Sequence, residues 1–365
     1  MAGSSYGSIF RITTWGESHG KGIGVVVDGC PAGLKLCEDD IQQYLNRRKP
    51  GQSRFTTPRK EDDAVEILSG VFEGKTTGTP ISMVVWNTNQ QSKDYSEIAS
   101  YYRPGHADYG FDQKYGFRDY RGGGRSSGRE TIGRVAAGAI ACKLLKELGI
   151  SVTAFTESIG PISIDKSHVD FSQVHQNALY MPDADAAENA TAYLEACVAD
   201  RNSAGGVIGC FVEGLPAGIG EPVFDKLDAN LAKAMFSIGA VKGFEIGDGF
   251  DVSTATGKSN NDAFVIKDGK ITKATNHSGG TLGGISDGTT VTMRVAIKPT
   301  PSISAPQQTV NRDHEEIQVS IKGRHDPIIV PRAVVVVESM AAITVLDLLL
   351  ANMTAKTDSI IDFYQ

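Results

Sequence analysis

One short phrase occurs twice in this chain of 365 residues and constrains its fold more than any other feature. VVVDGCPAGL at residues 25–34 returns as CFVEGLPAGI at residues 210–219, an apolar run followed by a Pro-Ala-Gly turn. A helical pattern follows each copy, at residues 38–48 and 223–235. Because most positions agree in identity or type around a rigid turn, we interpret the pair as an internal duplication. A chance match between two Gly- and Pro-rich turns is the alternative.

The remaining patterns predict one α+β domain over residues 1–365, with a duplicated core whose similar halves lie near 8–150 and 205–350. No linker or low-complexity tract marks a second domain. Alternating and β-branched residues predict strands at 8–15 and 23–28. Apolar residues at helical spacing predict helices at 129–148, 187–200 and 333–353, the last one buried and strand-like in its first few residues.

Composition argues against several classes of protein. A net charge of −7 disfavours a general nucleic-acid surface. The opening residues lack a signal peptide pattern and no apolar run reaches about 18 residues, so we expect a cytoplasmic protein without a membrane span. The cysteines are scattered and odd in number, so we expect neither a disulfide framework nor a metal site. They are Cys30, Cys37, Cys142, Cys197 and Cys210.

Arginine is concentrated in two stretches of this acidic chain. The planar guanidinium group suits carboxylate and phosphate, whereas lysine serves solubility equally well. We therefore predict a site for small anions, with a salt-bridged surface as the alternative. The first stretch holds Arg47, Arg48, Lys49, Arg54, Arg59 and Lys60, and the second holds Arg103, Arg118, Arg121, Arg125, Arg129 and Arg134.

Glycine-rich polar loops carry the candidate chemistry. Residues 14–24 (TWGESHGKGIG) surround His19 with glycines, and residues 118–131 (RDYRGGGRSSGRET) lead into a helix N-terminus, which suits phosphate. His106 stands in RPGHAD and Asp326 in IKGRHDPIIVPR. Neither the Walker A loop nor the GxGxxG fingerprint is present. A surface or satisfied structural histidine is the alternative at each position.

Five segments together resemble the chorismate synthase family from about residue 8 to residue 350. They are GESHGKGIGVVVDGCPAG, RPGHADY, GGGRSSGRET, GGTLGGIS and RHDPIIVPRAVVVVESM. The resemblance implies a β-α-β sandwich core, a homotetramer and one flavin per subunit. It also implies a 1,4-anti elimination that converts 5-enolpyruvylshikimate-3-phosphate to chorismate and phosphate. That reaction requires reduced FMN and has no net redox change.

The resemblance assigns roles to individual positions. His19 is similar to the histidine that protonates reduced flavin, His106 to the one that protonates the departing phosphate, and Asp326 to the aspartate that helps remove the ring proton. The implied substrate ligands are Arg48, Arg54, Arg103 and Arg129. The implied FMN contacts are Arg125, Ser126, Ser127, Gly239, Ala240, Gly283, Lys298, Pro299, Thr300, Pro301, Ser302 and Arg324.

Two other functions compete with this one. An NADPH-dependent flavin reductase would use the same pocket, with Arg48 and Arg54 meeting a dinucleotide phosphate. A flavin-binding relative without catalysis is the third hypothesis. The presence of all three candidate catalytic side chains disfavours it.

Overall fold

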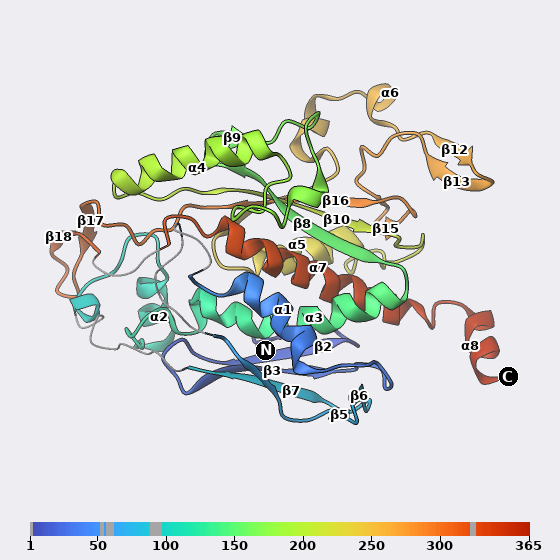
Figure 1. Cartoon of the computed structure of the whole chain (residues 1–365), viewed down its shortest axis with the longest axis horizontal. Coiled ribbons are helices and arrows are strands. Elements are labelled where there is room, and N and C mark those ends of the chain that lie inside the picture. The colour runs from blue at the N-terminus through green and yellow to red at the C-terminus, as the bar shows by residue number, and fades with distance from the viewer. Residues whose placement is uncertain (1–2, 52–54, 56–61, 88–96, 322–325) are drawn as a thin grey trace.

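The computed structural model describes residues 3–51, 55, 62–87, 97–321 and 326–365. Two five-stranded antiparallel sheets lie on either side of a helical layer (Figure 1). This arrangement confirms the predicted α+β class with a β-α-β sandwich. The first sheet has the order β1 (Ser5–Tyr6), β2 (Arg11–Gly16), β3 (Gly22–Asp28), β7 (Ile81–Trp86), β4 (Val65–Ile67). The second has the order β9 (Ile162–Ser163), β8 (Ser151–Ile159), β10 (Gly206–Glu213), β16 (Val291–Ile297), β11 (Val241–Ile246).

Four helices form the layer between the sheets: α1 (Glu38–Arg48), α3 (Thr131–Glu147), α5 (Leu227–Phe236) and α7 (Val330–Asn352). α1 has the predicted bounds, with acidic residues in its first turn and basic residues in its last. α3 follows a 3₁₀ turn, η4 (Gly128–Glu130), and packs closely on α7 because Gly138 faces Ser339. α5 begins four residues later than the sequence predicted.

α7 is the central helix of the molecule. Its first residues are helical, so the predicted strand-like start is wrong: Pro331 stands in the first turn, and burial among α3 and the second sheet overrides the β preference of its valines. By length and composition α7 could cross a membrane, but 78% of its most apolar window is buried inside the folded chain. It therefore has the surroundings of a core helix.

The repeated turn is held by the same kind of contact in both places. Thr76 Oγ1 donates to Pro31 O at 2.6 Å, and Ser286 Oγ donates to Pro216 O at 2.6 Å. Each hydroxyl also accepts from the backbone N–H three residues after its proline. The strands that precede the two turns, β3 and β10, each occupy the middle of their five-stranded sheet. The boundaries of the two halves, near 8–150 and 205–350, stay a prediction.

Smaller elements decorate the sandwich. α4 (Ala184–Ala199) confirms the predicted helix at 187–200 and lies outside the second sheet (Figure 1). Four short hairpins and three helices of these described residues were not predicted from the sequence. The hairpins are β5 (Val71–Phe72) with β6 (Lys75–Thr76), β12 (Phe264–Lys267) with β13 (Lys270–Lys273), β14 (Thr281–Leu282) with β15 (Ile285–Ser286), and β17 (Gln307–Val310) with β18 (Glu316–Val319). The helices are α2 (Asp108–Tyr115), α6 (Gly257–Asn260) and α8 (Thr357–Tyr364).

Candidate active site

His106 and its neighbours connect residues 103–106 to residues 298–302, which are distant in the sequence. Its Nδ1 lies 3.0 Å from Pro104 O, and because a carbonyl oxygen only accepts, Nδ1 carries the proton. Its Nε2 lies 2.9 Å from Ser302 Oγ. Lys298 Nζ donates to Gly105 O at 2.7 Å beside it. The structure therefore brings the predicted segments 103–106 and 298–302 together.

The ring of His106 is neutral in this environment. Burial lowers its pKa to about 4, and the positive charge of Arg103 adds to the effect against the opposing contributions of Pro104 and Asp108. Near pH 7 the hydroxyl of Ser302 consequently donates to Nε2. A phosphate dianion beside the ring would favour the protonated form and raise this pKa.

His19 is buried in the loop between β2 and β3, with Nδ1 3.0 Å from Ser18 Oγ. Gly122 approaches it closely: the φ of Gly122 is +82°, and a Cβ built there would lie 2.7 Å from His19 Cε1. Only a residue without a side chain fits this backbone against the imidazole. Gly122 of segment 118–131 thus positions His19.

Arg103 connects the surroundings of the two histidines. It forms a bidentate pair with Asp108, from Nε at 2.8 Å and from Nη2 at 2.7 Å. Nη2 also donates to Gly122 O at 3.4 Å, next to His19. The same Asp108 Oδ2 that accepts from Arg103 Nε also lies 3.2 Å from Arg118 Nη1. Arg103 therefore holds the site together in addition to its predicted role as a substrate ligand.

Arg48 and Arg129 meet at one buried carboxylate. Arg48 Nη2 lies 2.5 Å from Asp63 Oδ2, and Arg129 Nη1 lies 3.2 Å from Asp63 Oδ1. Arg129 also donates to Asn87 Oδ1 from Nε and Nη2. Burial lowers the pKa of Arg48 to about 10, which still leaves it charged near pH 7. Two predicted substrate ligands are thus brought together.

Asp326 lies beside the same cluster. One of its oxygens accepts from Arg332 Nη1, and Arg332 Nε donates to Arg48 O at 3.0 Å. Arg332 was not a candidate in the sequence analysis, yet it ties Asp326 to Arg48. The predicted Arg54 and Arg324 lie outside the described residues.

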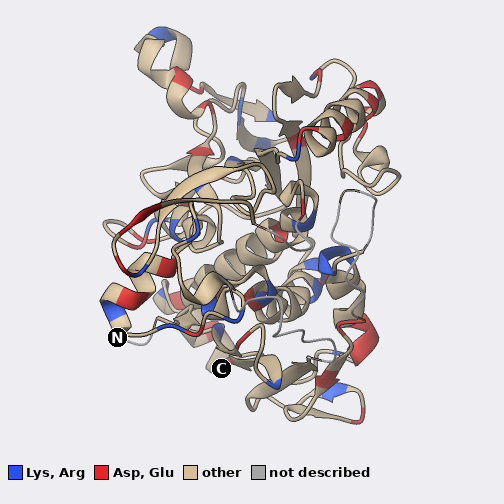
Figure 2. Cartoon of the chain, turned by 90° about the vertical axis from the view of Figure 1, so that its left-hand side faces the viewer, with Lys and Arg blue, Asp and Glu red and all other residues tan. Residues whose placement is uncertain are grey.

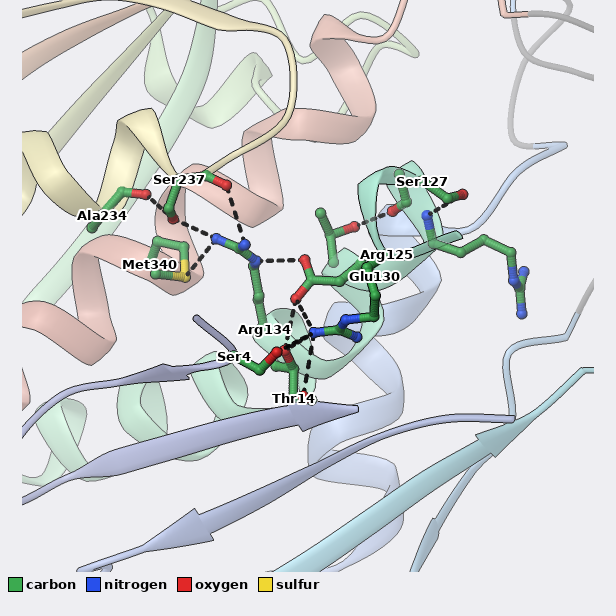
Figure 3. A network of polar contacts seen from close by, with 12 residues as sticks. Ser4, Thr14, Arg125, Ser127, Glu130, Arg134, Ala234, Ser237 and Met340 are labelled. Atoms are coloured by element: carbon green, nitrogen blue, oxygen red, sulfur yellow. Dashed lines mark hydrogen bonds and ion pairs between the residues drawn. The ribbon is translucent and has the colours of Figure 1, made fainter. Parts of the chain in front are cut away.

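Glu130 lies at the centre of a second buried network (Figure 3). Its carboxylate accepts from Thr14 Oγ1 at 2.8 Å and from Arg134 Nε at 2.7 Å, with Arg125 Nη2 at 3.5 Å. Arg134 also donates to Ser237 Oγ at 2.5 Å and to Ser237 O at 3.1 Å. The network ties the start of α3 to the end of α5.

The predicted cofactor residues at 125–127 form hydrogen bonds within the protein. The guanidinium of Arg125 turns inward and donates to Gly16 O at 3.0 Å and to Thr14. Ser126 Oγ donates to Gly123 O at 2.7 Å. Ser127 Oγ accepts from the N–H of Arg129 at 3.3 Å and caps η4.

The other predicted cofactor residues fall into two places. Ala240, at a φ of +73°, accepts from the N–H of Lys298 at 2.9 Å, so 239–240 adjoins the segment that holds Pro299, Thr300, Pro301 and Ser302. Gly283 lies near the opposite end of α5, where Gly284 O accepts from the N–H of Leu227. A ten-residue helix is about 15 Å long, so α5 separates Gly283 from Gly239.

The charge of these networks favours an anionic ligand. Three buried carboxylates each pair with two arginines; because Arg118 also lies 3.8 Å from Asp112, the excess of positive charge is clearest around Asp63 and Glu130. Within the described part of the chain, the buried Nε of Arg48 has no hydrogen-bond partner. Figure 2 faces this side of the molecule and shows basic segments among the central helices. The three sets are Asp63 with Arg48 and Arg129, Asp108 with Arg103 and Arg118, and Glu130 with Arg125 and Arg134.

Sequence reasoning missed the residues that hold these arginines: Asp63, Asn87, Asp108, Glu130 and Arg332. Asp63, Asp108 and Glu130 stand beside or within the arginine-rich stretches and Arg332 ends the segment IKGRHDPIIVPR, whereas Asn87 carries no such signal. Among the described residues, no group of three or more His, Cys, Asp or Glu side chains could hold a metal ion. All five cysteines are free thiols.

The fold defines an α+β protein, and its buried arginine networks favour a small anionic ligand. A family model described as chorismate synthase matches residues 10–350. The chain is 71% identical over 365 residues to a chorismate synthase of Agathobacter rectalis, with 100% of both chains covered. It is 53% identical to one of Methanosarcina mazei, with 96% of this chain and 97% of the relative covered.

A solved structure described as "Crystal Structure of Chorismate Synthase" aligns with a TM-score of 0.77 at 32% identity, covering 98% of each chain. The chain belongs to the chorismate synthase family. Its activity is accordingly that of a lyase of the shikimate pathway, acting on a small molecule.

Proposed function

We propose that the chain converts 5-enolpyruvylshikimate-3-phosphate to chorismate and inorganic phosphate by a 1,4-anti elimination that depends on reduced FMN without net redox change. The observation that carries this proposal is the set of three carboxylates that each pair with two arginines, around His19 and His106. The substrate has three anionic groups, so it matches the excess of positive charge.

Departure of phosphate is the step that His106 serves in this proposal. The leaving group gains negative charge as its bond to carbon breaks. Two cations lie near His106: Lys298 donates to Gly105 O, and the charge of Arg103 acts on the imidazole. The phosphate raises the pKa of the ring, so Nε2 takes a proton and donates it to the departing oxygen. Removing one such donor from a dry site typically costs about 3–4 kcal/mol of barrier.

Asp326 and His19 complete the proposed set of catalytic groups. Asp326 accepts the ring proton, and its pairing with Arg332 fixes its orientation. His19, held against Gly122, serves as the acid toward the cofactor. Reduced FMN, when bound, supplies an electron-rich ring that promotes loss of phosphate. The residues that would hold it are those at 125–127, Gly239, Ala240, Gly283, those at 298–302, and Arg324.

A homotetramer in the cytoplasm completes the proposal. Both features come from the resemblance to the family. Light scattering after size-exclusion chromatography measures the assembly directly: a mass of four chains supports the tetramer and a single-chain mass contradicts it.

The function is tested by mixing the purified protein anaerobically with 5-enolpyruvylshikimate-3-phosphate and chemically reduced FMN. We expect chorismate absorbance and free phosphate to appear together, and only with the reduced flavin. Aerobic NADPH consumption in the presence of FMN would instead point to a flavin reductase. FMN binding without either product would identify a non-catalytic relative.

His106→Ala is the first variant to compare, with the exposed His168→Ala as its control. We expect turnover of the His106 variant to fall by about 10²–10³-fold, while FMN affinity stays within about twofold. The His168 variant keeps wild-type turnover. Unchanged turnover of His106→Ala would remove this residue from the mechanism.

A further inference from the structure

Asp63 is a buried carboxylate in the short segment before β4. Its side chain has 0% exposure, although the residue stands at the end of an acidic run that looks solvated in the sequence. Its backbone adopts a φ of +47°, in the left-handed region that a non-glycine residue occupies at a free-energy cost of about 1–3 kcal/mol. A buried charge on strained backbone requires strong compensation.

Two guanidinium groups provide this compensation. Arg48 approaches Oδ2 at 2.5 Å and Arg129 approaches Oδ1 at 3.2 Å, and both arginines are themselves almost fully buried. Burial alone would raise the pKa of Asp63, but the charges of Arg48 and Arg129 outweigh it and lower the pKa. The carboxylate is therefore ionised near pH 7. One negative charge against two positive charges leaves the cluster positive.

The cluster is connected to the rest of the site on both sides. Asn87 accepts from Arg129 with its carbonyl oxygen and donates through Nδ2 to Glu17 O at 3.0 Å and Gly20 O at 2.9 Å, in the loop that carries His19. Arg48 Nη1 donates to Gly128 O at 3.3 Å, at the start of η4. A shift of the Arg129 guanidinium would therefore disturb the loop of His19, and a shift of the Arg48 guanidinium would disturb η4, which leads into α3.

We propose that Asp63 is a positioning residue that orients Arg48 and Arg129 toward the anionic groups of the substrate. Asp63 accepts a hydrogen bond from Arg48 Nη2 and forms an ion pair with Arg129, while Asn87 Oδ1 accepts from Nε and Nη2 of Arg129. The substrate therefore meets donors that are already oriented. The excess positive charge then attracts the substrate instead of a second internal carboxylate. This inference rests on the proposed function.

Asp63→Asn is the first test because it keeps the shape and removes the charge. Its matched control is Asp62→Asn, the same substitution one residue away on an exposed side chain. We measure binding of 5-enolpyruvylshikimate-3-phosphate to the protein loaded with oxidised FMN by calorimetry, and KM and kcat with reduced FMN. We expect Asp63→Asn to weaken substrate binding and raise KM at least tenfold while FMN affinity stays within twofold. Asp62→Asn matches the wild type.

Asp63→Glu separates positioning from mere charge balance, and it serves also if Asp63→Asn fails to fold. It restores the charge but displaces both guanidinium groups by the length of one methylene group. We expect its thermal stability to exceed that of Asp63→Asn because the charge is restored, while substrate binding stays at least fivefold weaker than in the wild type. A purely structural carboxylate predicts that Glu restores both stability and binding.

The outcomes distinguish this inference from the proposed function. If the wild type binds and converts the substrate while the foldable Asp63 variants bind it within twofold of the wild type, the positioning role is overturned. If the wild type itself neither binds nor converts the substrate, the proposed function fails and the inference fails with it.

Discussion

Gly122→Ala tests how the site positions His19. The new methyl group would lie 2.7 Å from His19 Cε1 and 2.8 Å from Nδ1, whereas ordinary contacts begin at 3.4 Å. The imidazole must therefore move by about 0.7 Å, the difference between these distances. Misplacement of a reacting group by about 1 Å lowers rates by about 10²-fold. We expect turnover to fall by about 100-fold in the anaerobic assay.

Backbone strain must be separated from this contact. Gly122 has a φ of +82°, where alanine costs about 1–2 kcal/mol of stability whatever its neighbours. Gly116 has a φ of +78°, and a Cβ built there meets nothing within 4 Å. Gly116→Ala should therefore lose similar stability in urea denaturation and keep its turnover. The reasoning is refuted if the two variants have turnover within twofold of each other.

Three further predictions follow from the buried networks and the repeated turns. Glu130→Gln deprives two arginines of their carboxylate and should lower the free energy of unfolding by about 3 kcal/mol. The control Glu147→Gln, at the exposed end of α3, should lower it by less than about 0.5 kcal/mol. Equal losses in urea denaturation would contradict this prediction. Because its pKa is about 4, the ring of His106 should stay neutral well below pH 6.5 in NMR titrations of the ligand-free protein. The unfolded chain then binds a proton that the folded chain does not, so this group reduces stability as pH falls from 6.5 toward 4. An NMR titration midpoint near pH 6.5 would contradict this prediction. Thr76→Val and Ser286→Ala each remove the hydroxyl of an equivalent turn and should cost similar amounts, about 1–2 kcal/mol, by urea denaturation; a loss at only one turn would argue against their equivalence.

Local patterns in the sequence predicted the long helices well, but not α2, α6 or α8. α1 was predicted with its observed bounds because its acidic start, apolar face and basic end coincide with a helix. The start of α7 was predicted wrongly, since four consecutive valines favour a strand locally and only tertiary burial makes them helical. The order of the strands depends on contacts distant in sequence, so local patterns could not provide it.

The candidate site was predicted unevenly for a physical reason. Glycine loops and arginines signal an anion site by residue type, and the structure joins His106 to Ser302 and Arg48 to Arg129 through Asp63. The partners of the arginines carry no such signal. Asp63 follows four charged residues and has the pattern of a solvated surface, yet its side chain is fully buried.

In the proposed reaction, the site eliminates phosphate with a flavin that is not consumed. The most direct measurement supplies reduced FMN equal to the enzyme under strict anaerobiosis and follows chorismate, phosphate and flavin absorbance together. We predict many equivalents of chorismate and phosphate in a one-to-one ratio while the flavin ends the reaction reduced. Product limited to one equivalent per flavin, with matching flavin oxidation, would contradict the account.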